Sequence, residues 1–167
     1  GNSLWGSKIK DIMPIIDETG SDSGMFDNCL EFLVMSGRSL PHAVMMMIPE
    51  PWGKNPHIEP DLKAFFEYHN SLIEAWDGPA AMAFTDGRTI CAALDRNGLR
   101  PSRYYITPDD TIVLASEVGV VDLDPATIVK KDRLRPGRML VIDTVAGRII
   151  GNDEIKHKIA TEQPYRK

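Results

Sequence analysis

Apolar residues in the first half of the chain recur with the period of an α-helix. After the polar run 21–23 they fall at spacings of three, four, seven and eight residues, which predicts a helix that ends near Gly37. The members of this stripe are Phe26, Cys29, Leu30, Leu33 and Val34. A second, mostly apolar helix is predicted between Ser39 and Pro49, and a third begins at Pro60 and keeps its stripe as far as Trp76.

The second half of the chain has the shorter alternation that is typical of β-strands. Two apolar runs, 80–84 and 90–94, flank Asp86-Gly87, a dipeptide that favours the tight turn of a hairpin. We expect the stretch 77–117 to form a buried antiparallel meander. Further strands and a last helix are predicted at 112–115, 139–144, 148–150 and 153–160, with Asn152 as the helix cap. Helices followed by antiparallel strands predict an α+β fold, with helices on one or both faces of a sheet.

Length and composition place the chain among ordinary globular proteins. Its 167 residues fit a single domain, 1–167, and 43% of them are hydrophobic and 26% charged. A net charge of −5 argues against a nucleic acid or an anionic membrane surface as partner. No apolar run approaches the roughly 20 residues of a membrane span, and the distant pair Cys29 and Cys91 favours reduced core thiols and a cytoplasmic location.

Polar residues crowd the turn between two of the predicted core strands, at 95–103. This turn could be solvated, with its arginines in surface ion pairs of about 0–1 kcal/mol each. Alternatively, Asp95 could fix the arginines in a network that shapes the wall of a site. We favour the network, because a turn this charged between apolar strands usually has buried partners.

A second polar cluster, Ser21-Asp22-Ser23, stands where the first helix is predicted to begin. The simplest interpretation is a helix cap, since all three residues are good cap types. The functional interpretation is that a carboxylate beside free N–H groups can hold the ammonium group of a zwitterion. Taken alone, the cluster favours the cap as its whole role, and it becomes informative about function only together with the helix and the strand motif that follow it.

The remaining reactive side chains are better explained by packing. His69 lies on an apolar helical face, which favours a hydrogen-bonded core histidine, and no spacing among the histidines and cysteines fits a zinc site. The three methionines at 45–47 are expected to fill the core. Arg133, Arg135 and Arg138 form a small basic patch that we interpret as a solvated face. A cysteine hydrolase that uses Cys91 with His69 is a weaker alternative, which a depressed thiol pKa would favour.

Several of these motifs together resemble one known family. Asp77-Gly78-Pro79, the Asp-Gly hairpin, the run Asp95-Arg96-Asn97-Gly98-Leu99-Arg100-Pro101-Ser102-Arg103-Tyr104 and Ala115-Ser116-Glu117 are similar to the glutamine amidotransferase domain of the N-terminal-nucleophile class, in the form found in glutamate synthase large subunits. The resemblance covers about 15–165 and includes Gly20-Ser21-Asp22-Ser23 and Leu134-Arg135-Pro136-Gly137. Gly1-Asn2 and Trp5 also match the family.

The resemblance implies a part of a four-layer α/β/β/α sandwich that binds L-glutamine. Asp22 matches the aspartate that holds the substrate's α-amino group, with Gly20, Ser21 and Ser23 as supporting residues. The positions Asp95–Arg103 and Ser116-Glu117 match only the sheet behind the site, so no catalytic residue and no metal ligand is expected in this chain. In the family the nucleophile is an N-terminal cysteine, and the oxyanion hole is formed by the Asn-Gly of a His-Asn-Gly-Glu segment. This sequence has no N-terminal cysteine and no Asn-Gly-Glu.

The function that the resemblance implies is glutamine hydrolysis that feeds ammonia to glutamate formation. Without the nucleophile segment, the chain alone is expected to be inactive and to need the remainder of the glutamate synthase large subunit. FMN and an iron–sulfur cluster are expected in other domains of the whole enzyme and not in this chain. The alternative is a non-catalytic binding or interface module that keeps this part of the fold.

Overall fold

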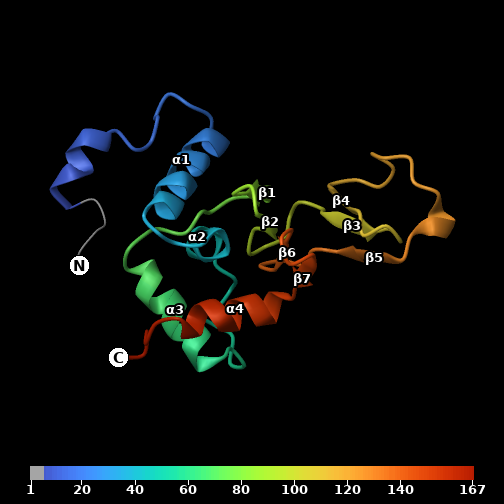
Figure 1. Cartoon of the computed structure of the whole chain (residues 1–167). Coiled ribbons are helices and arrows are strands. Elements are labelled where there is room, and N and C mark those ends of the chain that lie inside the picture. The colour runs from blue at the N-terminus through green and yellow to red at the C-terminus, as the bar shows by residue number, and fades with distance from the viewer. Residues whose placement is uncertain (1–5) are drawn as a thin grey trace.

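The computed structural model describes residues 6–167 and shows helices followed by antiparallel strands (Figure 1). Gly1, Asn2 and Trp5, which contribute to the family resemblance, lie outside the described residues. The helices are η1 (Gly6–Ile12), α1 (Asp22–Met35), α2 (Leu40–Met47), α3 (Pro60–Asn70), η2 (Pro125–Thr127) and α4 (Asn152–Thr161). The strands are β1 (Ala81–Thr85), β2 (Thr89–Leu94), β3 (Arg103–Ile106), β4 (Ile112–Ala115), β5 (Lys130–Arg133), β6 (Met139–Asp143) and β7 (Arg148–Ile150). The α+β prediction is confirmed.

The first two helices agree with the sequence, whereas the third is shorter than its apolar stripe. α3 ends at Asn70, and the predicted continuation to Trp76 is wrong. The Ser71 hydroxyl donates to the Tyr68 carbonyl at 2.7 Å, and the Trp76 N–H donates to the Met47 carbonyl at 2.7 Å. The chain therefore leaves the helix for a tertiary contact with the end of α2 that still buries part of the stripe.

The strands form two sheets instead of one meander. The four-stranded sheet has the order β1-β2-β6-β7, and the three-stranded sheet has the order β4-β3-β5. The β1–β2 hairpin is confirmed, with Phe84 opposite Cys91 in its register. The predicted continuation from β2 into β3 is wrong, because the second edge of β2 pairs with β6, where Cys91 lies opposite Val141. All pairs in both sheets are antiparallel.

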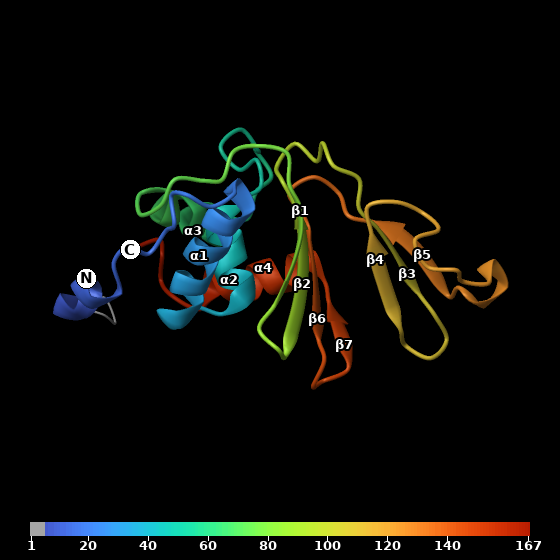
Figure 2. The ribbon, with the colours of Figure 1, turned by 90° about the horizontal axis from the view of Figure 1, so that it is seen from above.

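The main core lies between α1–α4 and one face of the four-stranded sheet. Figure 2 shows the four helices on one side of β1, β2, β6 and β7, with the three-stranded sheet on the other side. Apolar residues of α1, α2 and α3 pack against Cys91, Ala93 and Val141 on the sheet, and the methionines of 45–47 are fully buried there, as predicted. A smaller cluster joins the opposite face to the three-stranded sheet: Ala92, Leu94, Tyr104, Leu134 and Leu140.

A buried ion pair fastens α4 to the loops beneath it. The Lys156 ammonium donates to the Gly137 carbonyl at 2.8 Å and to the Glu50 carboxylate, and its side chain is 4% exposed. Asn152 is the first residue of α4 and not its cap; Gly151 is the cap, and the Asn152 side chain accepts instead from the Met139 N–H at 3.1 Å. In the part of the chain that is described, no helix is long and apolar enough to cross a membrane.

Candidate functional site

The residue predicted to bind substrate, Asp22, is the first residue of α1 and is exposed. Ser21 caps the helix: its Oγ accepts from the Gly24 N–H at 3.2 Å and lies 3.1 Å from the Ser23 Oγ. Among the described residues, none forms a hydrogen bond or ion pair with the Asp22 carboxylate. The cap interpretation is thus confirmed for Ser21, while Asp22 is left free to meet a ligand at the end of the helix that favours negative charge.

A tight turn leads the chain into this helix start. The Gly20 N–H donates to the Asp17 carbonyl at 3.1 Å, and a Cβ at Gly20 would lie 3.2 Å from that oxygen. The Asp17 carboxylate accepts from the Thr19 hydroxyl at 2.6 Å and from the Thr19 N–H at 2.9 Å, and these bonds lower the pKa of Asp17. The Asp17 N–H donates to Asn28 Oδ1 at 3.0 Å, which ties the turn back onto α1. These bonds fix the backbone just ahead of Asp22.

Aromatic packing places the first turn of α1 against the edge of the four-stranded sheet. Phe26 is buried one turn after Asp22, stacks on Phe84 of β1 at 5.7 Å between ring centroids, and meets Trp76 edge-to-face at 5.0 Å. β1 is the outer strand of its sheet in the described chain. The start of α1 therefore lies near β1, whose outer edge has unpaired N–H and C=O groups available to a further strand (Figures 1 and 2).

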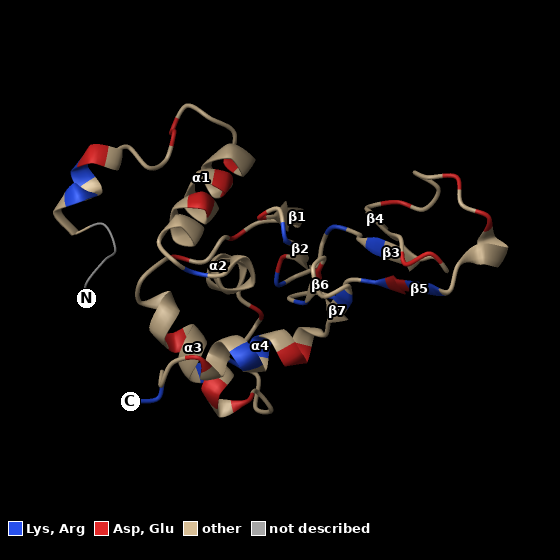
Figure 3. Cartoon of the chain, viewed as in Figure 1, with Lys and Arg blue, Asp and Glu red and all other residues tan. Residues whose placement is uncertain are grey.

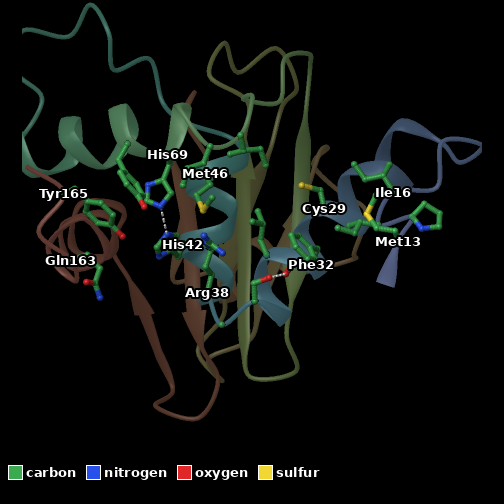
Figure 4. A pocket seen from close by; sticks show the side chains of 18 of the residues that line it. Met13, Ile16, Cys29, Phe32, Arg38, His42, Met46, His69, Gln163 and Tyr165 are labelled. Carbon is green, nitrogen blue, oxygen red and sulfur yellow. Dashed lines mark hydrogen bonds between the residues drawn. The ribbon is translucent and has the colours of Figure 1, made fainter. Parts of the chain in front are cut away.

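A wide hollow of the described chain lies elsewhere, on the outer side of the helices, and Asp22 does not line it (Figure 4). At its floor, the Nε2 atoms of His42 and His69 are 3.1 Å apart, and His69 Nδ1 lies 2.8 Å from the Phe65 carbonyl. Because a carbonyl only accepts, His69 Nδ1 carries the hydrogen, and His69 Nε2 accepts from His42. Burial lowers the pKa of His42 to about 4 and also lowers that of His69.

This geometry decides between the interpretations of His69 and Cys91. His69 is a hydrogen-bonded core histidine, as predicted, and both of its ring nitrogens are engaged. Cys91 is fully buried in β2, and burial raises the pKa of its thiol to about 12. A cysteine hydrolase needs a depressed thiol pKa, whereas the thiol pKa of Cys91 is raised. The structure therefore gives no support to a hydrolase that uses Cys91 with His69. Cys29 is half-buried, and burial raises its thiol pKa as well.

The charged turn at 95–103 is a network, but not the predicted one. The buried Asp95 carboxylate accepts from the backbone N–H groups of Ala80, Asn97 and Gly98 at 2.9–3.1 Å, and not from arginines. Arg96 instead pairs with Asp77 at 2.9 Å on the surface. Asp95 therefore shapes the turn by binding three of its backbone N–H groups.

The predicted basic patch is divided. Arg138 pairs with Asp153 at 3.3 Å, whereas Arg133 and Arg135 line a second hollow together with Arg100 and Arg103. Sequence reasoning missed this meeting of two distant segments, and also the His42–His69 pair, since neither has a local signal. Within residues 6–167, no group of three or more His, Cys, Asp or Glu side chains could hold a metal ion.

Comparison with known proteins identifies relatives of this sequence. The family described as glutamine amidotransferases class-II matches residues 1–167. The chain is 53% identical over 163 residues to the glutamate synthase [NADPH] large chain of Bacillus subtilis, an alignment that covers 98% of this chain and 11% of that protein. It is 49% identical over 166 residues to the glutamate synthase [NADH] of Schizosaccharomyces pombe, covering 99% and 8%.

A plant relative is also matched over nearly all of this chain but only a small part of its own length. Over 165 residues the chain is 42% identical to the chloroplastic ferredoxin-dependent glutamate synthase of Oryza sativa subsp. japonica, covering 97% of this chain and 10% of the relative. The chain thus spans about a tenth of the length of the curated relatives that it matches.

Proposed function

Because the chain belongs to the class II glutamine amidotransferase family, we propose that it is part of the glutaminase region of a glutamate synthase large chain. In this function, L-glutamine is hydrolysed and the ammonia released is used to form glutamate. The support is the family match over 1–167, together with a free carboxylate at the position where the family resemblance expects substrate contact.

Asp22 is the residue of this chain to which we assign a role with substrate. Its carboxylate holds the α-ammonium group of glutamine, because an ionised carboxylate and an ammonium group form a charge-assisted hydrogen bond. Gly20, Ser21 and Ser23 support it: the turn at Gly20 and the serine cap hold the backbone on each side. The exposed Asp22 at the start of α1, beside the outer strand β1, is the observation that carries the proposal.

The nucleophile and the oxyanion hole come from residues outside this chain. A cysteine whose own α-amine acts as base attacks the amide carbon, and N–H groups at an Asn-Gly pair stabilise the negative oxygen of the tetrahedral intermediate. The open edge of β1 gives such a segment a place to pair close to Asp22. With that segment added, the helices and the two sheets become part of the four-layer α/β/β/α sandwich of this enzyme class.

The redox cofactors of the whole enzyme belong to other domains. An iron–sulfur cluster needs several cysteine ligands. This chain has only Cys29, on α1, and Cys91, buried in β2. We therefore propose that the cluster lies outside these residues, as the family resemblance also implies for FMN, and we assign no step to either of them here.

The experiment that tests this function uses the full-length large chain and the variant Asp22→Asn. We expect kcat/KM for glutamine hydrolysis to fall at least about tenfold, mainly through a higher KM, because the variant loses the charge-assisted hydrogen bond to the substrate ammonium group. Asp27→Asn, exposed on the next turn of α1, is the matched control and should leave hydrolysis unchanged. Equal activity of Asp22→Asn and wild type would refute the role of Asp22.

A second assay separates the enzyme from the non-catalytic alternative. The 167-residue chain by itself should release no glutamate from glutamine, whereas a mixture with the upstream cysteine-bearing segment should do so. Hydrolysis by the isolated chain would contradict the argument from the missing nucleophile. A mixture that is folded but inactive, with a full-length protein that is inactive too, would favour a binding or interface module.

A further inference from the structure

Four arginines converge where the chain crosses between the two sheets. They come from two segments, 98–103 and 133–136, which lie far apart in the sequence but side by side in the fold. Figure 3 shows both crossings in blue between β2, β6 and the three-stranded sheet. The hollow between them has a volume of about 690 Å³, a size typical of small-ligand pockets. Its charged lining residues are Arg100, Arg103, Arg133 and Arg135, and none of its lining residues is acidic.

The backbone holds these arginines together. Arg103 of β3 lies directly opposite Arg133 of β5, so both side chains leave the sheet on the same face. The Leu134 N–H donates to the Ser102 carbonyl at 3.0 Å and extends this pairing into the loops. At Gly98, with φ +61°, a Cβ would clash with the ring of Pro136, so the two loops are in direct contact. The cluster is therefore built into the fold before any ligand arrives.

The charges of this cluster are not neutralised by the described part of the chain. Arg96, Arg138, Arg148 and Arg166 each pair with a carboxylate. Within residues 6–167, no carboxylate comes within 4.0 Å of the four guanidinium groups of the hollow. Like charges directly opposite each other on neighbouring strands are destabilising. The chain has a net charge of −5, so acidic residues are plentiful, yet none of the described ones pairs with these arginines.

A buried hydroxyl adds an independent observation. Ser102 is only 5% exposed and lines the hollow between the arginines. No hydrogen bond from its Oγ to another of the described residues is present, and no fully enclosed side-chain atom among them is left without a partner. The Ser102 hydroxyl therefore opens toward the hollow, where it can donate to a bound oxygen atom.

We propose that this hollow is an oxyanion-binding site for a ligand that carries two negative charges, a dicarboxylate or a phosphate. Guanidinium groups bind both through paired N–H···O bonds, and the neighbouring Arg103 and Arg133, on the same face of paired strands, can bind one anionic group together. Arg100 and Arg135 then meet the second charge, and Ser102 fixes the orientation. The source is a free small acid or an acidic group from elsewhere in the full-length protein, and the chemistry is the same for both.

The first test is calorimetric titration of the full-length protein with inorganic phosphate and with succinate at constant ionic strength. We expect saturable binding of at least one of them, weakened at least about tenfold in Arg100→Gln/Arg133→Gln. The control Arg88→Gln/Arg148→Gln removes the same charge from the far end of the four-stranded sheet and should bind like wild type. Preference for succinate or for phosphate identifies the ligand class.

The second test covers the case in which neither anion binds. Phenylglyoxal labelling of the full-length protein, followed by mass mapping, measures how accessible each arginine is. Protection of the four arginines relative to exposed Arg88 would show that an acidic group of the protein already fills the hollow, which supports the site and assigns its source. Absence of anion binding together with labelling equal to that of Arg88 would overturn the proposal. Glutamine hydrolysis is not a readout of either test, so this inference stands or falls separately from the proposed function.

Discussion

The helical half of the molecule and the three-stranded sheet differ in how they are held in place. α1–α4 fill a continuous core against the four-stranded sheet, with side chains such as Phe65, Met45 and Val141 almost fully buried. The three-stranded sheet contributes only Tyr104 and the adjoining Leu134 as buried members of its cluster, and every residue of β5 is exposed. Burial of apolar surface therefore stabilises the first region. The second region is held in place by contacts at the joint, which is formed by the two crossing segments 98–103 and 133–136.

The contrast explains where charge is found. In the helical half, the deeply buried ammonium group of Lys156 meets a carboxylate and a carbonyl. In the second region, four arginines face a hollow with no acidic partner in the described chain. A tightly packed core must satisfy its polar groups internally, while a surface region can leave them for a ligand.

Breaking the buried ion pair should give the largest effect. Lys156→Met leaves the mostly buried Glu50 carboxylate and the Gly137 carbonyl without their donor, so we expect a loss of about 3–5 kcal/mol in the free energy of unfolding. Urea denaturation followed by circular dichroism measures it. The exposed Lys158→Met is the control, and it should change stability by less than about 0.5 kcal/mol. If the double variant Glu50→Gln/Lys156→Met regains stability, the loss is due to the unpaired carboxylate. A loss of stability as large in Lys158→Met would contradict this assignment.

The joint between the two regions should be the next most sensitive place. Gly98→Ala forces a Cβ into Pro136 at a positive φ, for an expected cost of about 2–3 kcal/mol. Hydrogen exchange should show faster opening of β3, β4 and β5, while β2 and β6 keep their protection. Gly53→Ala, in an open loop at an ordinary φ, is the matched control. Uniform loss of hydrogen-exchange protection in both sheets would mean that the three-stranded sheet is not held separately from the helical core.

Acid should destabilise the helical half through the His42–His69 pair. The pKa of His42 is lowered to about 4 by burial, with contributions from His69 and Arg38, whereas the unfolded chain titrates near 6.5. Between these pH values the unfolded state binds more protons, so stability falls as pH drops from about 6.5 to about 4 and levels off below. With allowance for solvent screening, we expect about 1–2 kcal/mol from this group.

Urea midpoints measured across this pH window test the expectation. His42→Gln keeps a donor for His69 but cannot titrate, so its stability should depend less on pH than that of wild type. His57→Gln, exposed in the loop before α3, should follow wild type. A wild-type stability that is flat from pH 6.5 to pH 4 would contradict the burial of a neutral pair.

The parts of this fold that sequence could predict are those with a local cause. The stripe after Ser21, the Asp86-Gly87 hairpin and the core position of His69 all follow from neighbouring residues, and all three are confirmed. The end of α3 and the pairing of β2 with β6 were not predictable, because each depends on a partner distant in the chain. The exposure of Asp22 follows from its place at a helix start, but its position beside β1 depends on Phe26 packing against Phe84.

The smallest effect is expected from a side-chain hydrogen bond within the three-stranded sheet. The Tyr104 hydroxyl donates to Asp132 Oδ2 at 3.2 Å across the β3–β5 pair, and this bond lowers the pKa of Asp132 together with a bond from the Arg133 N–H, which has the larger effect. Tyr104→Phe keeps the buried ring and removes the bond, so we expect a loss of about 0.5–1 kcal/mol, measured by urea denaturation. Tyr105→Phe, on the outer face of the same strand, is the control. A cost above about 2 kcal/mol would show that polar bonds hold this sheet as firmly as the core holds the helices, and the distinction between the two regions would fail.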